Sequence, residues 1–209
     1  MAADNVAIAN MALQKIGARS ITALTDDTAE GRAVNAIYTD MLDEVLMEHP
    51  WTFAQRRTAL GTSSSSVDFT DDGLTVLYDK PAGFLKLNFT NNSSAIVKIE
   101  EAGILSDVDD LKAIYTVRVT AVGSYPAQFV SALATRLASE LAYNLVNSAT
   151  KAKELYEEYE KIRLPRAIDA DSTQGSPDAV KQDAWERAMI SGSSDVMGRP
   201  GDETWHPTW

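Results

Sequence analysis

The side chains suited to acid–base chemistry in this 209-residue chain include only two histidines, His49 and His206. A Ser-His-Asp hydrolase needs its histidine held between a nucleophile and a carboxylate, and no Gly-x-Ser-x-Gly motif presents a serine. His49 precedes Pro50 at the end of an expected helix, where the partial negative charge of the helix C-terminus favours a capping or packing role. The sequence therefore does not predict a catalytic histidine.

The carboxylates suggest two further kinds of site. Residues 107–110, Asp-Val-Asp-Asp, resemble the start of a calcium-binding loop, but Lys112 stands where glycine is required and Arg118 where the closing glutamate is required. We interpret this run as a solvated turn. A carboxylate pair for glycoside hydrolysis stays open, because its two members can be distant in the sequence. No phosphate-binding glycine loop is present, and we predict no metal and no cofactor.

Composition excludes other chemistry. The chain contains no cysteine, which removes disulfides, zinc-thiolate sites and cysteine nucleophiles and suits a reducing cytosol. Its formal net charge of −11 disfavours a protein that grips nucleic acid by its phosphates. We see neither a signal peptide nor an apolar run of the roughly 18 residues that a membrane span requires.

Four helices are predicted from apolar periodicity. The first follows Asp4 and ends at Gly17, and the second begins with a capping box at residues 27–30 and ends before Pro50. The third starts at Pro126 and should be central, because leucines and alanines recur along it. The fourth covers about residues 150–163, with Leu155, Tyr159 and Ile162 inward, until Pro165 ends or kinks it.

Strand-like alternation occupies the middle of the chain. Leu85, Leu87 and Phe89 alternate with polar residues, and residues 115–120 do the same. Residues 74–78 and 96–99 are weaker strand candidates. We expect a mainly α (α+β) fold in which residues 1–50 and 121–170 form an antiparallel helical bundle. A small antiparallel β-sheet is inserted at residues 51–120, and residues 171–209 form an extended C-terminal docking segment.

That segment is unusual for its aromatic content. A short helix over residues 178–190 would carry Trp185 and Met189, and the Gly-, Ser- and Pro-rich stretch beyond it holds Trp205 and Trp209. Tryptophan is enriched at interface hot spots, and disordered tails usually have few aromatics. We therefore predict that these four side chains dock into a partner, the alternative being packing against the parent domain.

The junction between helix and sheet is the other distinctive stretch. Pro50 should stop the helix, while Trp51 and Phe53 should pin the first strand against the helices. Arg56 and Arg57 follow at once. They suit a contact with nucleic acid or with a neighbouring subunit, or they simply keep an edge strand soluble.

Several segments together resemble a known family. They are Ala-Leu-Gln-Lys-Ile-Gly at 12–17, Ile-Thr-Ala-Leu-Thr-Asp at 21–26, Asp-Glu-Val-Leu at 43–46, His-Pro-Trp-Thr-Phe-Ala at 49–54 and the Ala- and Leu-rich stretch 133–142 with the helix after it. In this order they resemble the tail tubular protein A family, the head-to-tail adaptor proteins of tailed, especially short-tailed, bacteriophages. The resemblance covers roughly residues 5–170, although the sheet insert does not align.

The resemblance implies a structural virion protein with no enzymatic activity, made in the host bacterial cytoplasm. It implies a homo-oligomer, a twelve-subunit ring that binds the portal protein above and the tail nozzle below. DNA would pass through the centre without specific binding, the C-terminal segment would clasp the portal, and no membrane would be involved. Two alternatives remain: a virion-associated cell-wall hydrolase with paired carboxylates, and a non-viral cytosolic helical binding module.

Overall fold

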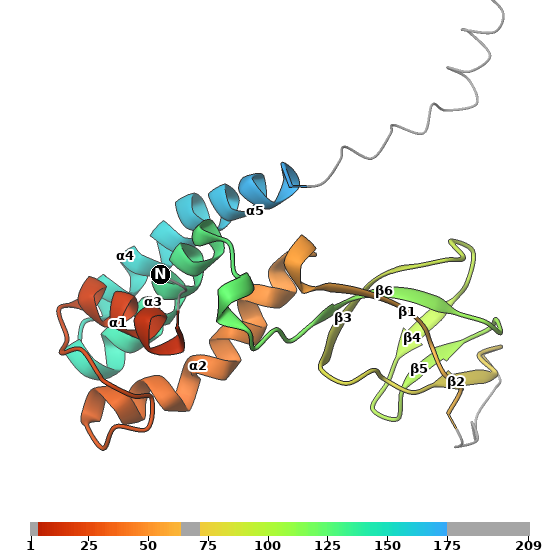
Figure 1. Cartoon of the computed structure of the whole chain (residues 1–209), viewed down its shortest axis with the longest axis horizontal. Helices are drawn as coiled ribbons and strands as arrows, with labels where there is room; N and C mark the ends of the chain where they lie inside the picture. The colour runs from red at the N-terminus through yellow and green to blue at the C-terminus, as the bar shows by residue number, and fades with distance from the viewer. Residues whose placement is uncertain (1–3, 64–71, 175–209) are drawn as a thin grey trace, which may run out of the picture. The chain divides into compact units, whose positions relative to one another are not determined.

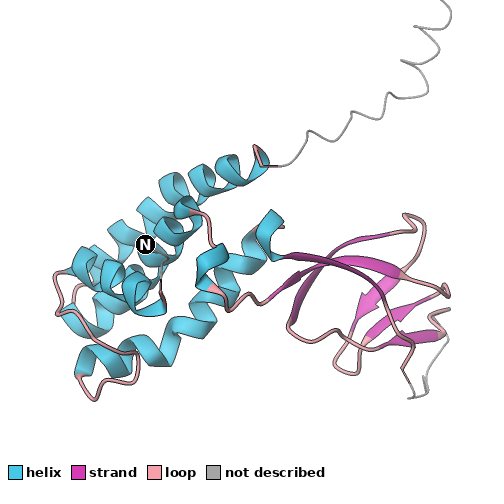
Figure 2. Ribbon diagram, in the orientation of Figure 1, coloured by secondary structure: helices cyan, strands magenta, loops and turns pink. Residues whose placement is uncertain are grey.

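The computed structural model describes residues 4–63 and 72–174, and its elements are labelled in Figure 1. The helices are α1 (Asn5–Ile16), α2 (Ala29–Glu48), α3 (Ala127–Val146), α4 (Ala149–Glu158) and α5 (Leu164–Ser172). Short helical turns are η1 (Thr52–Ala54), η2 (Val122–Ser124) and the π-helix η3 (Tyr159–Arg163). The strands are β1 (Gln55–Ala59), β2 (Val76–Tyr78), β3 (Phe84–Thr90), β4 (Val97–Ile99), β5 (Ile104–Ser106) and β6 (Lys112–Val117). The fold is mixed α+β (Figure 2).

The first two helices end and begin close to their predicted signals. Gly17 ends α1 in the left-handed conformation with φ of 77°, which a residue without a Cβ adopts at little cost. The cap of α2 lies one residue later than predicted. Thr28, not Asp27, occupies the N-cap, and its hydroxyl accepts a hydrogen bond from the Gly31 amide at 3.0 Å.

Helix α3 is surrounded by the other helices, as its composition predicts. Its leucines 133, 137 and 141 and its alanines 134, 138 and 142 are all fully buried. The alanine stripe permits close approach of a neighbouring helix, and α1, α2, α4 and α5 all contact α3. The apolar side chains of these helices form one continuous core.

The helical path after α4 does not end near Arg163. It continues through the π-helix η3 into α5, and Pro165 lies in the first turn of α5. The wider π turn also changes which side chains face inward. Leu155 and Tyr159 are buried as predicted, but Ile162 is 44% exposed, so its predicted inward position is wrong.

Residues 51–120 contain two small sheets instead of one. Both are three-stranded and antiparallel, with strand orders β1-β6-β3 and β2-β5-β4. Strand β5 carries no clear alternation and was not among the predicted strands. Tyr78, Leu111 and Tyr115 contribute to a separate core between the sheets.

Strand β3 departs from the predicted alternation because its register against β6 shifts twice. Leu85 packs against the helical core, and Leu87 packs against the sheet core. Phe89 is 60% exposed, so the prediction that it shares a buried face with the two leucines is wrong. A β-bulge re-aims side chains in this way because an extra residue breaks the period of two.

Two boundaries complete the description. The described residues form one compact unit that contains helices and sheets together. Helix α5 ends at Ser172, two residues beyond the predicted limit of the helical region at residue 170. Within residues 4–63 and 72–174, no helix has the length and apolarity to cross a membrane.

Candidate functional site: the helix–sheet junction

Residues 49–54, one of the segments on which the expected family resemblance depends, form the junction between α2 and β1. Helix α2 ends at Glu48, and His49 takes an extended conformation with ψ of 148°, because the proline ring of Pro50 disfavours a helical residue before it. The half-buried Pro50 leads into η1, and Gln55 then begins β1.

Trp51 fixes the junction to the helices. Its side chain is fully buried, and the indole Nε1 donates a hydrogen bond to the Val45 carbonyl at 2.8 Å. The Trp51 ring meets Phe129 edge-on with centroids 5.1 Å apart, and Phe53 meets the same ring at 4.9 Å. Tyr125 completes this aromatic cluster. Such pairs add stability beyond burial alone, so the start of β1 is firmly held by α3.

A buried carboxylate of α5, distant in the sequence, holds the same junction. Asp171, in the last turn of α5, is 2% exposed. It accepts hydrogen bonds from the Thr52 amide at 3.0 Å and the Thr52 hydroxyl at 2.7 Å, and His49 Nε2 lies 3.4 Å away. A buried carboxylate is tolerated when it is paired in this way. The contact ties α5 to the junction.

The combination of His49, Asp171 and a hydroxyl invites comparison with a catalytic triad. In a triad the hydroxyl bonds the imidazole, which takes its proton, and the carboxylate bonds the other side of the ring. Here the Thr52 hydroxyl donates directly to Asp171. The arrangement therefore lacks the bond between nucleophile and base, and its geometry is that of a structural tie.

A second polar cluster lies where α2 meets α3. The guanidinium of Arg136, 7% exposed, donates to both oxygens of Glu44 at 3.0 Å and to Glu140 at 2.6 Å. Tyr156 lies 5.3 Å from it in a cation–π contact. Burial acts to lower the pKa of Arg136, but its hydrogen bonds to Glu44 and Glu140 outweigh burial and raise that pKa. Two carboxylates thus neutralise one buried cation.

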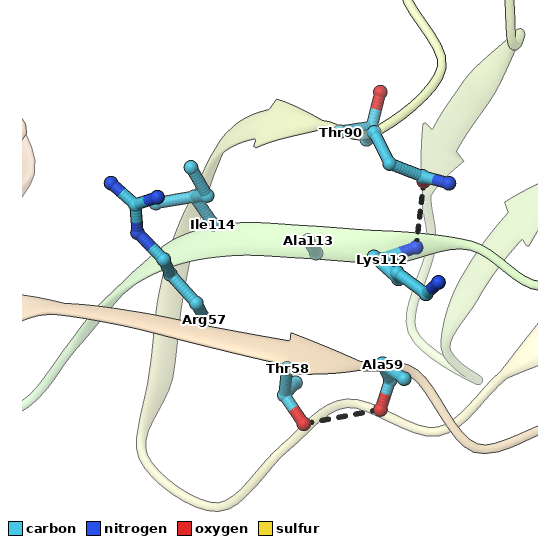
Figure 3. A pocket seen from close by; sticks show the side chains of 8 residues that line it. Arg57, Thr58, Ala59, Thr90, Lys112, Ala113 and Ile114 are labelled. Carbon is cyan, nitrogen blue, oxygen red and sulfur yellow. Dashed lines mark hydrogen bonds between the residues drawn. The ribbon is translucent and has the colours of Figure 1, made fainter.

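The predicted arginine pair lies on an edge. β1 is an outer strand of its sheet, and both Arg56 and Arg57 are exposed. Neither forms an ion pair with any residue that the structure describes. Beside Arg57 the sheet carries a shallow hollow of about 360 Å³, shown in Figure 3.

The remaining predicted positions fall outside the described residues. These are the docking side chains Trp185, Met189, Trp205 and Trp209 of the C-terminal segment. No group of three or more histidine, aspartate and glutamate side chains within 4–63 and 72–174 could hold a metal ion.

Asp171 and Arg136 were missed as interacting residues. Asp171 lay at the predicted start of the docking segment, and its partners at 49–52 are distant in the sequence. Glu44 and Arg136 lie in two helices that are distant in the sequence, and nothing in the sequence indicates that these two residues are in contact. A charged residue within an otherwise apolar stripe, as Arg136 is among leucines and alanines, was the available hint.

In comparisons with known proteins, the chain matches no protein-family model and no curated protein sequence.

Proposed function

We propose that the protein is a structural component of a bacteriophage virion, a head-to-tail adaptor that joins the portal to the tail nozzle. Its copies would form a twelve-subunit ring, and the ring would form part of the channel for DNA ejection. The resemblance of residues 5–170 to the tail tubular protein A family supports this assignment. The mixed fold, with strands between two sets of helices, agrees with the layout that the resemblance implies.

The single observation that carries the proposal is the construction of the junction at residues 49–54. Trp51 is anchored in the helical core, while Thr52 is bonded to Asp171 of the last helix. A repeated ring subunit needs a fixed orientation between its parts, so that every copy presents the same surfaces. The residues that carry the resemblance supply that rigidity and form no nucleophile–base pair.

Within this proposal the helices form an antiparallel bundle, and the C-terminal segment is the part that clasps the portal. Helix α5 carries the chain to the start of that segment. Asp171 of α5 bonds Thr52, which holds this last described helix to the junction. The tryptophans at 185, 205 and 209 and Met189 are the proposed anchors in the portal.

The acidic balance suits a channel through which DNA moves. A wall that attracted phosphates would retard ejection, and a like-charged wall would let DNA slide. We propose that the ring presents carboxylates to its lumen. A lumen lined by Lys and Arg would overturn this part of the proposal.

The test is a binding experiment with the portal protein encoded in the same genome. The full chain should co-sediment with portal particles. A variant ending at Gln174, which keeps Asp171 and its bonds, should remain folded and lose that binding. Undiminished binding of the shortened variant would remove the docking role of the segment. Absence of binding by the full chain would remove the adaptor function.

A further inference from the structure

On the face of the sheet β1-β6-β3 that carries Ile114, the end near Thr116 is buried, whereas the end near Lys112 is exposed. Side chains directly opposite one another on neighbouring strands share a face. Arg57 and Phe89 both lie opposite Ile114, so the three form a row across the sheet, and Ala59 lies opposite Lys112 in the next row. Phe89 at 60% exposure is among the most exposed large apolar side chains described. Aromatic residues and arginine, the types found in this row, are enriched at protein–protein interfaces.

The hollow on this sheet is basic as well as apolar. Its lining residues include two cations and no carboxylate, as Figure 3 shows: Arg57, Thr58, Ala59, Thr90, Asn91, Lys112, Ala113 and Ile114. Lys112 Nζ lies 3.5 Å from the exposed Asp110 carboxylate. Arg57 forms no ion pair with any described residue. In a chain of net charge −11, this surface stands out as one that an acidic partner would fit.

The same chain carries a matching acidic surface on α2. That helix has five carboxylates and one arginine. Asp43 and Glu44 are paired within the subunit, with Arg118 and Arg136 respectively. Asp40 is exposed and forms no ion pair with a described residue, although its charge contributes to the raised pKa of Arg118. Asp40 is therefore available to a second molecule.

We propose that the open sheet face of one copy docks against the exposed side of α2 in a second copy, with Arg57 facing Asp40. The inference rests on the proposed ring and names its contact surfaces. Because the two surfaces lie on different elements, the contact is heterologous, and a pair of copies keeps one free sheet face and one free α2 surface. Repetition of a heterologous contact builds a ring when the rotation closes.

Nucleic acid is the competing occupant of the face, because Arg57 and Lys112 could also meet phosphates. Two observations favour the second copy. The face holds only two lining cations, whereas binding to phosphates needs several. It also exposes Phe89 beside half-buried Ile114, and apolar contact suits a helix surface better than a duplex backbone.

Disulfide trapping tests the contact directly, since the chain contains no native cysteine. Thr39→Cys places a thiol beside Asp40, and Ala59→Cys places one on the sheet face, both at exposed positions. Mixed under mild oxidation, with one variant tagged to separate the masses, they should form the mixed dimer in high yield. As the control, Thr75→Cys replaces Ala59→Cys. Thr75 is exposed and belongs neither to α2 nor to the sheet β1-β6-β3. A mixed-dimer yield no greater than that of the control would overturn the inference.

Reversing the charges of Arg57 and Asp40 in the same cysteine variants tests whether these two residues face each other. Arg57→Glu in both partners should lower the yield about tenfold, since like charges then face each other across the contact. Adding Asp40→Lys should restore the yield, because the pair is then reversed. Equal yields for all three backgrounds would contradict the pairing. Retention of duplex DNA by the native chain, lost in Arg57→Glu without change in trapping, would assign the face to nucleic acid instead.

The result of the trapping experiment can be distinguished from the result of the portal-binding experiment. Trapping needs no portal, so copies can prove to meet through these surfaces even where the portal does not bind. Portal binding without trapping would leave the adaptor function standing and refute only these contact surfaces.

Discussion

Helix α3 buries side chains around most of its circumference, whereas strand β3 directs its three apolar side chains to three different places. Of the leucines expected to form the α3 stripe, Leu133, Leu137 and Leu141 are fully buried, and Leu145 is half-buried. Leu85 joins the helical core, Leu87 joins the sheet core and Phe89 is exposed. The apolar stripe of α3 is enclosed by the other helices, while β3 leaves Phe89 exposed, and in the proposed assembly this part of the sheet meets a partner. Folding stability should therefore depend on the helices and junction, and assembly should depend on the sheet face.

The largest expected effect compares two aromatic residues. Trp51→Ala should lower the free energy of unfolding by about 3–5 kcal/mol, since it removes a fully buried ring and its hydrogen bond to Val45. Phe89→Ala should change that free energy by less than about 0.5 kcal/mol, because its ring is exposed. Urea unfolding followed by circular dichroism measures both. Similar losses for the two variants would break the distinction between the regions.

The next prediction compares the losses of stability caused by replacing two arginines, Arg136 and Arg118. Arg136→Met leaves Glu44 and Glu140 without their cation and should cost about 2–3 kcal/mol, below the value for a fully buried pair because both carboxylates are partly exposed. Arg118→Met breaks the more exposed pair with Asp43 and should cost less than about 1 kcal/mol. Chemical denaturation of the two variants side by side gives the difference. A larger loss for Arg118→Met would show that the junction with the sheet, not the helical interior, contains the critical ion pair.

Asp171→Asn tests whether α5 is held to the junction. The amide is uncharged and offers one acceptor oxygen where the carboxylate offers two, so its hydrogen bonds from Thr52 should be weaker, and we expect a loss of about 1–3 kcal/mol. Hydrogen exchange in α5 should accelerate more than exchange in α3. Asp169→Asn, at an exposed position in the same helix, is the matched control. Unchanged protection of α5 in Asp171→Asn would mean that the buried carboxylate does not hold the helix.

Two tyrosines should respond in opposite directions. The Tyr159 hydroxyl is buried without a hydrogen-bond partner among the described residues, so Tyr159→Phe should be neutral or stabilise by up to about 1 kcal/mol. The Tyr38 hydroxyl donates to Asn5 at 3.0 Å, and Tyr38→Phe should destabilise by about 1 kcal/mol. Thermal unfolding of both variants provides the comparison. Destabilisation by Tyr159→Phe would reveal a partner for that hydroxyl in solution.

The smallest expected effect concerns pH. Burial acts to raise the pKa of Glu158, but hydrogen bonds from Arg163 and Lys15 outweigh it and lower that pKa below its usual value. A carboxyl with a lowered folded-state pKa contributes stability above its unfolded pKa, and the contribution disappears as the pH falls through the folded value. Glu158→Gln should therefore cost less than about 1 kcal/mol near neutral pH and nothing in acid. A cost that persists in acid would point to packing rather than charge.

Local sequence signals predicted the helices well, because a period of 3.6 and the capping residues act within a few positions. Gly17, Pro50 and the α3 stripe each lie where their chemistry requires. The sheets were harder, since the bulges that turn Phe89 outward depend on pairing with β6, which is distant in the sequence. The site shows the same limit. Trp51 was expected to pin the junction, but Asp171, which accepts hydrogen bonds from Thr52, could be found only from the folded chain.

Electron microscopy of the full chain mixed with its portal protein tests the central claim most directly. We predict that a ring of twelve copies adds to one end of each portal particle. Arg57→Glu should leave the fold intact and reduce the number of complete rings. Portal particles that remain bare in the presence of excess folded protein would contradict the account.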